Sequence, residues 1–202
     1  IDAELIDITD SLWKLIGINN ASLEINSLGS SETRSSYRKL LQDYFIDNKS
    51  QLDKDSLRRL TTNPLRILDS KDSEMEALIE SAPKMIDHLD DESDEHFSEF
   101  KNYLDCLEIP YSINPRLVRG LDYYNRTVFE WISNDLGAQG TICGGGRYDG
   151  LVEKMGGNPT PAIGFAIGIE RLILLIKDQP NKLQKNKPHL YFSTLGERAQ
   201  MT

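Results

Sequence analysis

The sequence predicts an α+β protein in which helices separate two regions of β-strand. Apolar and polar residues alternate over 21–28 and again over 123–131, which is typical of half-buried strands. Between these segments, apolar residues recur at helical spacing. Helices that lie between two strand regions indicate a helical subdomain inserted into a core that contains a sheet.

The composition is that of a soluble globular protein. The 202 residues include 39% hydrophobic and 27% charged side chains, and no apolar run approaches the length of a membrane span. The net charge of −9 counts against a protein that binds nucleic acid through its whole surface. Cys106 and Cys143 have no CxxC spacing and no nearby histidine partners, so we expect a reduced, cytoplasmic protein without a metal site.

The first helix is predicted to begin with Asp2 as its N-cap and to end at Gly17. The following strand places Leu23 and Ile25 on one face and Glu24 on the other. We interpret Glu24 as a residue that faces solvent rather than as a buried catalytic acid. The apolar positions of the helix follow a period of 3.6 residues and predict a core-facing stripe made of Leu5, Ile8, Leu12, Leu15 and Ile16.

Helices are predicted throughout the segment that follows, over 56–61, 73–82 and 94–107 among others. The acidic run 87–95 is interpreted as a solvated face rather than a metal site, with His88 and His96 on the surface. Two apolar stripes are interpreted as core seams rather than base-stacking surfaces. They consist of Tyr37, Leu40, Leu41, Tyr44 and Phe45 in the first helix, and of Phe97, Phe100, Leu104 and Leu107 in the last.

The segment from 117 to 131 combines charged, phenolic and apolar side chains. Arg119 and Tyr124 differ in parity, so an unbroken strand would point them to opposite faces, whereas Gly120 permits a turn. These residues alone leave two interpretations open. The segment is either a β-hairpin with surface Arg and Asp residues, or part of a site for a small molecule.

Glycines dominate the next segment. The run Gly144-Gly145-Gly146 is followed by Arg147-Tyr148-Asp149-Gly150, and it matches neither a P-loop nor a dinucleotide fingerprint. Three glycines in a row permit close approach of a ligand to the backbone, and a flexible turn explains them equally well.

A short buried strand is predicted over 161–167, in which Gly164 leaves room for a flat ligand. Gly168 then opens a helix over 169–177 that is apolar nearly all round and is therefore expected to be central. Arg171 lies in the first turn of this helix, where a cation gains nothing from the helix dipole. In one interpretation Arg171 forms a salt bridge with Glu170 or is solvated. In the other, Arg171 and the start of the helix together face a phosphate.

Three segments together resemble histidyl-tRNA synthetases of the bacterial kind, which are class II synthetases. Residues 117–124 are similar to the first histidine-specific signature of that family, 141–151 to the second, and 164–172 to motif 3. They occur in the family's order and spacing, and a looser similarity extends over almost the whole chain. The resemblance implies an antiparallel class II catalytic sheet, and an enzyme that uses ATP and Mg²⁺ to join histidine to tRNA(His).

The resemblance also implies the roles of individual residues. Arg119 would stabilise the charge that develops at the α-phosphate, which is work that a metal ion does in related enzymes. The residues implied to bind histidine are Arg119, Tyr123, Tyr124 and Tyr148, and those implied to bind ATP are Arg119, Gly168 and Arg171.

By the same resemblance, 1–30 and 108–178 belong to the catalytic core and 31–107 to a helical insertion domain. Residues 179–202 would form a linker and the start of an anticodon-binding domain, with 187–196 as the first strand of that domain. The chain begins without methionine and contains neither motif 1, which supplies the dimer interface, nor motif 2. We therefore expect a fragment of a longer homodimeric enzyme, inactive or nearly so by itself.

Two further alternatives stay open. The basic cluster formed by Lys54, Arg58, Arg59 and Arg66 either touches phosphates of the tRNA acceptor arm, as the resemblance allows, or balances the acids nearby. The competing function is the synthetase-like regulatory subunit of ATP phosphoribosyltransferase, which is a binding protein. The intact Arg119, Tyr124 and Arg171, with the segment 188–196, favour the synthetase.

Overall fold

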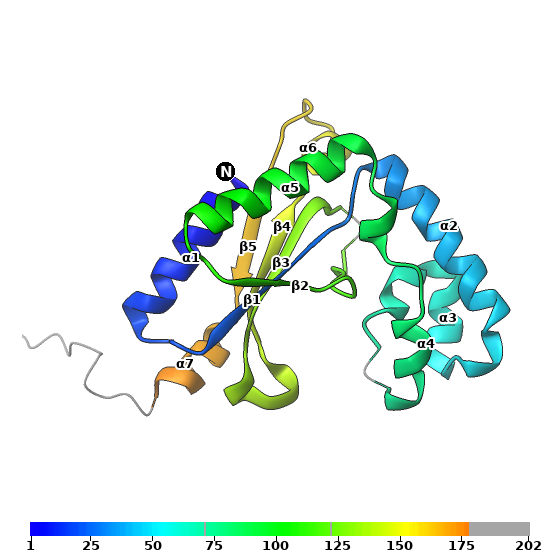
Figure 1. Cartoon of the computed structure of the whole chain (residues 1–202), viewed down its shortest axis with the longest axis horizontal. Helices are drawn as coiled ribbons and strands as arrows, with labels where there is room; N and C mark the ends of the chain where they lie inside the picture. Colours follow the sequence, from blue (N-terminus) through cyan, green and yellow to red (C-terminus); the bar gives the residue numbers. More distant parts are fainter. Residues whose placement is uncertain (71, 122, 178–202) are drawn as a thin grey trace, which may run out of the picture.

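The computed structural model describes residues 1–70, 72–121 and 123–177. Its sheet has five strands in the order β2-β1-β3-β4-β5 (Figure 1). Neighbouring strands are antiparallel except β1 and β2, which run parallel at one edge. The predicted α+β class with an antiparallel sheet at its centre is confirmed. The strands are β1 (Ala21–Ser27), β2 (Tyr111–Ile113), β3 (Asn125–Ser133), β4 (Thr141–Arg147) and β5 (Ile163–Ile167).

Alternation located β1 and β3 and missed β2 and β4. β1 begins at Ala21, as predicted, and buries Leu23 and Ile25. The strand expected from residue 123 begins two residues later, and its register shifts between Asn125 and Val128, where Arg126 has a φ of 51°. The sequence did not predict β2, since three residues are too few to show a period of two.

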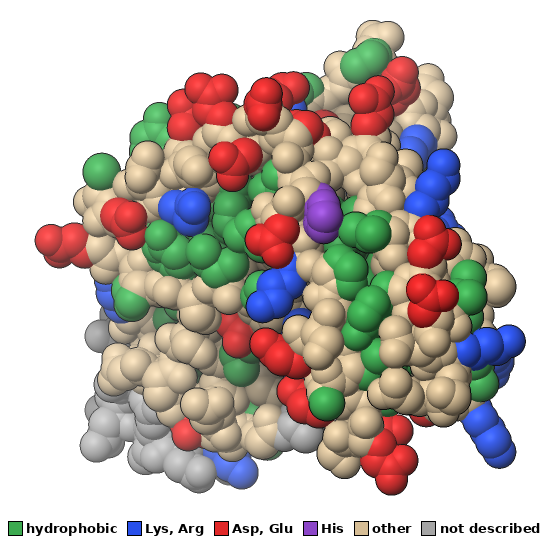
Figure 2. Space-filling model, turned by 45° about the vertical axis from the view of Figure 1, so that its right-hand side comes forward, with side chains coloured by type: hydrophobic (Ala, Val, Ile, Leu, Met, Phe, Trp, Pro, Cys, Tyr) green, Lys and Arg blue, Asp and Glu red, His purple; other side chains and the backbone are tan. Residues whose placement is uncertain are grey.

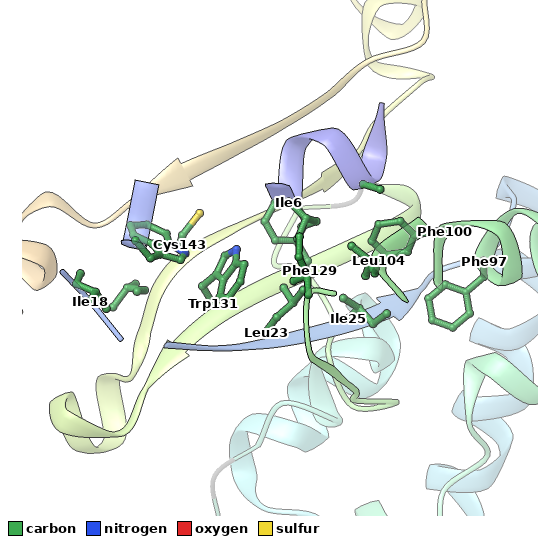
Figure 3. Close-up of a cluster of buried hydrophobic side chains, with 14 of the residues drawn as sticks. Ile6, Ile18, Leu23, Ile25, Phe97, Phe100, Leu104, Phe129, Trp131 and Cys143 are labelled. Atoms are coloured by element: carbon green, nitrogen blue, oxygen red, sulfur yellow. The ribbon is translucent and has the colours of Figure 1, made fainter. Parts of the chain in front are cut away.

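Two helices cover one face of the sheet, α1 (Asp2–Ile16) and α5 (Asp91–Cys106) (Figure 1). Their side chains and those of the strands form one core, in which the rings of Trp13 and Trp131 meet edge to face. The core is drawn in Figure 3 and includes Ile6, Trp13, Leu23, Ile25, Phe97, Phe100, Leu104, Phe129 and Trp131. The predicted division at residue 107 assigned α5 to the insertion. Because α5 packs on the sheet, we propose that the insertion ends before Asp91.

The helices between β1 and α5 form a second core of their own. They are α2 (Ser31–Asp47), α3 (Lys54–Thr62) and α4 (Glu76–Glu80), with 3-10 helices at Lys49–Gln51, Pro64–Ile67, Ser73–Met75 and Met85–His88. The seam predicted in α2 is buried at Tyr37, Leu41 and Phe45, whereas Leu40 is 38% exposed. Opposite α2, the second core is completed by Leu60, Ile67, Met75, Leu78 and Ile79.

The stripe predicted for α1 is only partly confirmed, because Leu5, Leu12 and Ile16 pack against the core at its edge while the centre of the buried face lies elsewhere. Ile8 and Leu15 are 54% and 81% exposed, whereas Ile6 and Trp13 are buried. Asp2 is also not the N-cap, because it lies inside the helix, which has no side-chain cap. The carboxylate of Asp2 points into the protein.

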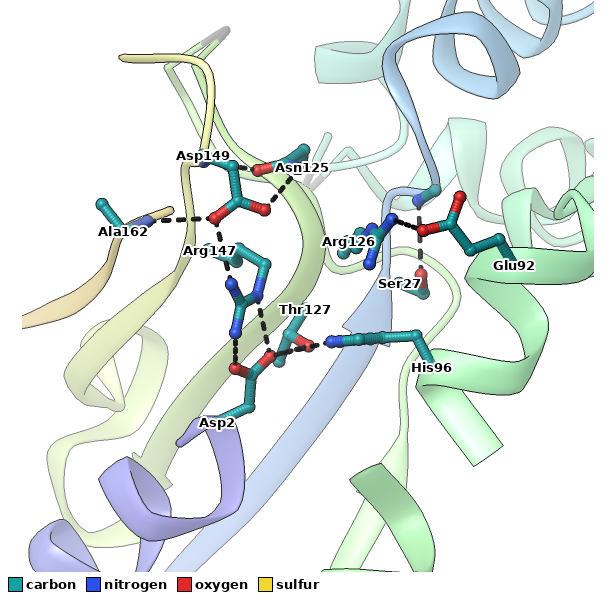
Figure 4. A network of polar contacts seen from close by, with 11 residues as sticks. Asp2, Ser27, Glu92, His96, Asn125, Arg126, Thr127, Arg147, Asp149 and Ala162 are labelled. Atoms are coloured by element: carbon teal, nitrogen blue, oxygen red, sulfur yellow. Dashed lines mark hydrogen bonds and ion pairs between the residues drawn. The ribbon is translucent and has the colours of Figure 1, made fainter. Parts of the chain in front are cut away.

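Asp2 instead joins a polar network between α1, α5 and the ends of β3 and β4 (Figure 4). Arg147 donates to Asp2 from Nε at 3.2 Å and to Asp149 from Nη1 at 3.0 Å, and Thr127 donates to Asp2 at 2.6 Å. Burial raises the pKa of Asp2, but the hydrogen bonds from Arg147 and Thr127 outweigh it and hold the pKa below its ordinary value. His96, predicted to lie on the surface, is only 22% exposed and lies 3.4 Å from Asp2.

The helix α7 (Ile169–Ile176) begins directly after Gly168, as predicted, but it is not central. It lies against β4 and the 3-10 helix Asn134–Gln139. Leu172 is buried, whereas Ile169, Ile173 and Leu174 are 57%, 54% and 51% exposed. The helix is apolar nearly all round in sequence, but this did not mean that all of its faces are buried. The helix α6 (Leu151–Lys154) lies between β4 and β5 in the chain.

Leu40 and Leu41 are neighbours in α2, but only Leu41 is fully buried, so the effects of their replacement on stability can be compared. Leu41→Ala should lower the free energy of unfolding by about 2–5 kcal/mol, because the side chain is fully buried in the second core. Leu40→Ala, on the exposed side of the same helix, should cost less than about 1 kcal/mol. Urea unfolding of both variants measures the difference, and equal losses would contradict the buried seam.

Candidate active site

Polar residues gather on the sheet face that α1 and α5 leave free. Glu24, Glu130, Gly144 and Ala166 lie directly opposite one another across β1, β3, β4 and β5. Residues paired in this way point to the same face of a sheet. Their chain neighbours, such as Leu23, point into the core on the other side.

Arg119 reaches this face from the segment that precedes β3. Its Nη1 donates to Oε1 of Glu130 at 2.5 Å, and its guanidinium carbon lies 5.6 Å from the ring centroid of Tyr124. A Cβ atom at Gly144 would lie 2.6 Å from the same Nη1. The first glycine of the run is therefore required by the guanidinium of Arg119.

Arg119 and Arg171 line one open cavity of about 470 Å³. Gly168 lies in the same wall, next to the side chain of Arg171. Arg171 donates from Nη1 to the backbone carbonyl of Thr141. The cavity thus has two guanidinium groups on its walls, an arrangement suited to an anion with more than one charged group.

Three tyrosines form a cluster beside Arg119. The ring centroids of Tyr123 and Tyr124 are 4.5 Å apart, and Tyr148 lies 5.6 Å and 6.0 Å from them. A hydrogen bond with Tyr124 raises the pKa of Tyr123 above its ordinary value. The hydroxyl of Tyr148 lies 2.7 Å from the position that a Cβ atom of Gly164 would occupy. The space over Gly164, expected to admit a flat ligand, is therefore filled by Tyr148.

The network in Figure 4 fixes both neighbours of Tyr148 in the chain. Besides its contact with Arg147, the Asp149 carboxylate accepts from Asn125 at 3.2 Å and from the amide of Ala162 at 3.0 Å. The charged side chains of Arg147 and Asp149 are therefore paired with other residues of the chain. Of the three consecutive residues Arg147, Tyr148 and Asp149, only Tyr148 faces the tyrosine cluster.

Two residues of the site were not singled out from the sequence, Glu130 and Thr141. The Thr141 hydroxyl donates to Oε2 of Glu130 at 2.9 Å, while Oε1 accepts from Arg119. The signal available in the sequence was the alternation of this segment, which places Glu130 on the same face as Tyr124. Its partner could not be predicted because Arg119 lies outside any strand.

A cavity of about 340 Å³ extends from Glu130 and Thr141 toward the insertion, and a second one, of about 250 Å³, shares part of its lining. Glu24 lines both and accepts from Asn114 Nδ2 at 2.6 Å. Its carboxylate lies on the face away from the core, as predicted, but in a cavity rather than in open solvent. Arg116 lines the same cavities and pairs with Glu76 of α4 at 2.6 Å.

The remaining candidates lie elsewhere or are unsuited to chemistry. Burial raises the pKa of the Cys143 thiol to about 12, so it is not a nucleophile at neutral pH. In the described ranges, no group of three or more His, Cys, Asp or Glu side chains is placed to hold a metal ion. Nor does any helix of these ranges have the length and apolarity needed to cross a membrane.

The basic cluster lies on α3 and the 3-10 helix after it, away from the cavity. Arg58 pairs with Asp55, and Arg59 donates to the carbonyl of Arg66 at 3.2 Å. Lys54 is exposed. Acidic side chains are spread over the face seen in Figure 2, and basic ones are scattered among them.

Asp122 of the first signature, and the expected linker and strand within 178–202, lie outside the described residues. The predictions made for them stay predictions.

Comparisons with known proteins give a consistent result. The family model described as histidyl-tRNA synthetase matches residues 1–172. A histidine–tRNA ligase from Ruthia magnifica is 62% identical over 201 residues, and one from Hydrogenovibrio crunogenus is 58% identical over 197 residues. These alignments cover 100% and 98% of this chain, but 48% and 46% of the relatives. The chain therefore spans about half the length of the curated relatives it matches.

A solved structure agrees with the sequence comparison. The apo crystal structure of Staphylococcus aureus histidyl-tRNA synthetase superposes with a TM-score of 0.73 at 35% sequence identity. The match covers 99% of this chain and 49% of that one.

Neighbouring glycines should respond differently to the same substitution. Gly144→Ala meets only the flexible end of Arg119, so the fold should hold while the guanidinium moves and the affinity for pyrophosphate falls. Gly145→Ala places its Cβ 2.2 Å from the Gly164 carbonyl, and it should cost about 1–3 kcal/mol of stability because backbone cannot give way.

Urea unfolding and calorimetric titration of the full-length protein with pyrophosphate separate these effects. Gly150→Ala is the control, since its Cβ would meet no atom within 4 Å. Equal destabilisation by Gly144→Ala and Gly145→Ala would contradict the geometry.

Proposed function

Because the chain belongs to the histidyl-tRNA synthetase family, we propose that the protein of which it forms part is a histidine–tRNA ligase. It would activate histidine with ATP to give histidyl-adenylate and pyrophosphate, and then transfer the histidyl group to tRNA(His). The observation that carries the proposal is the single cavity lined by Arg119 and Arg171, beside the cluster of three tyrosines. Two cations in the cavity and a phenolic cluster beside it suit a nucleotide joined to an aromatic amino acid.

In the first step, a carboxylate oxygen of histidine attacks the α-phosphorus of ATP. The bond from that phosphorus to the bridging oxygen breaks, and pyrophosphate leaves with the electron pair. Arg119, which lies at the tyrosine end of the cavity, would bind the attacking carboxylate and stabilise the negative charge on the α-phosphate oxygens. In the second step, a ribose hydroxyl at the 3′ end of the tRNA attacks the carbonyl carbon, and AMP leaves.

The other site residues take supporting roles. Arg171, next to Gly168 at the start of α7, would hold the γ-phosphate, and Mg²⁺ would enter as the counter-ion of ATP. The Tyr124 hydroxyl would hydrogen-bond the imidazole of the substrate. Tyr123 and Tyr148 pack against Tyr124 and would complete the histidine pocket.

The remaining proposals concern the full-length protein. We expect a cytoplasmic homodimer, in which Lys54, Arg58, Arg59 and Arg66 contact the tRNA backbone. The pairing of Arg58 with Asp55 favours the alternative that this cluster balances local acids, so the contact is the weaker proposal. The names of the relatives support a ligase over the regulatory subunit of ATP phosphoribosyltransferase.

Replacement of Arg119 tests the proposal. In the full-length protein, Arg119→His should lower kcat for histidine-dependent ATP–pyrophosphate exchange by about 10²- to 10³-fold, with a much smaller change in histidine affinity. Tyr124→Phe removes a single hydroxyl and should mainly raise KM for histidine. If Arg119→His weakens histidine binding as much as it slows exchange, Arg119 is a binding residue, and a wild type without histidine-dependent exchange would refute the ligase.

A further inference from the structure

The two arginines of the cavity are connected by an unbroken chain of hydrogen bonds. Arg119 donates to one oxygen of Glu130, and the hydroxyl of Thr141 donates to the other. The carbonyl of Thr141 accepts from Arg171. Glu130 and Thr141 therefore bridge Arg119 and Arg171 through two side-chain contacts and one main-chain contact.

A carboxylate at position 130 is repelled by a neighbouring carboxylate, whereas a neutral side chain there would not be. Glu130 lies directly opposite Glu24 in the β1–β3 ladder, and like charges at opposed positions repel each other. Glu24 is paired with the neutral amide of Asn114, so it gains no opposite charge from that partner. The guanidinium of Arg119 offsets the repulsion, and Glu130 in turn fixes that guanidinium above Gly144.

The position of Thr141 depends on an irregularity of β4. The ladder passes from Trp131 opposite Cys143 to Ile132 opposite Thr141, which leaves Ile142 as the extra residue of a β-bulge. In a regular strand, residue 141 would point with Cys143 into the core. The bulge places Thr141 on the face of Glu130 instead.

We propose that Glu130 and Thr141 are positioning residues that hold the two arginines at a fixed separation across the cavity. The proposal rests on the function proposed above, because that function gives the arginines phosphates to bind. Neither residue needs to touch the substrate. Arginines ordered before ATP arrives lose less freedom in the transition state, and their charge need not reorganise during the reaction.

Removal of Glu130 should change kcat and KM for ATP in a combination that unfolding of the protein would not produce. Removal of Glu130 takes a negative charge away from a site for a polyanion, so the affinity for ATP should not fall. Removal also releases Arg119, so the rate of adenylate formation should fall. In the full-length protein, Glu130→Ala should lower kcat by about 10- to 100-fold with KM for ATP unchanged or lower.

Threonine 141 supplies a second, milder test. Thr141→Val keeps the shape of the side chain and removes its hydrogen bond, so kcat should fall by roughly threefold to tenfold. Thr141→Ser restores the hydroxyl and should recover kcat to within about twofold of the wild type. Glu92→Ala is the matched control, because it removes the partner of Arg126 at the surface, outside the cavity, and should leave kcat unchanged.

Histidine-dependent ATP–pyrophosphate exchange and thermal melting of the full-length variants decide the matter. The proposal is overturned if Glu130→Ala and Thr141→Val keep kcat within about twofold of the wild type. It is equally overturned if both variants lose kcat and Tm together and Thr141→Ser restores neither, because the residues would then serve the fold.

A structural measurement separates this proposal from the proposed function. A crystal structure of the ligand-free, full-length Glu130→Ala variant should show the Arg119 guanidinium displaced from its place above Gly144. An unmoved guanidinium would overturn the positioning role even if the wild type activates histidine. A displaced one would support that role even if the wild type shows no exchange and the ligase assignment fails.

Discussion

The candidate site depends on the absence of a side chain at Gly144. The guanidinium of Arg119 lies so close to the strand that a Cβ atom at Gly144 would be 2.6 Å from its Nη1. The glycine also lies in register with Glu130, which supplies the opposite charge. One strand thus provides the space, its neighbour provides the charge, and together they fix a cation on the free face of the sheet.

This arrangement is compatible with the anion site proposed for an acidic chain. The sequence has a net charge of −9, so the long-range field repels a polyanion. At short range, Arg119 and Arg171 face the same cavity, and a pair at hydrogen-bond distance outweighs distant charges that solvent and salt screen. Glu130 reduces the local positive charge, but it also removes the freedom of Arg119 to turn away. Placement of the cation matters more here than the net charge around it.

The sequence predicted periodic features well and contacts between distant segments poorly. Alternation located β1 and β3 because each strand has one buried face. The buried face of α1 was predicted only in part: Leu5, Leu12 and Ile16 pack against the core, but Ile8 and Leu15 are exposed. Asp2 looked like a cap because its partner Arg147 is 145 residues away. The glycine run was interpreted either as a place where a ligand approaches the backbone or as a flexible turn, whereas it lies in strand β4 and the group close to Gly144 is Arg119. Such facts depend on tertiary register, which one sequence does not encode locally.

The same reasoning extends from the site to the insertion. The first signature and the residue before it contact the insertion at three places: Arg116 pairs with Glu76 of α4, Arg34 of α2 donates to the carbonyl of Tyr124, and Val118 packs against the second core. Val118 also packs against the cluster that contains Tyr124. Val118 therefore connects the insertion with the tyrosine cluster. The sheet orders Arg119 through Glu130, and the insertion orders the backbone at Tyr124, so the relative position of these two groups depends on how the insertion rests on the core.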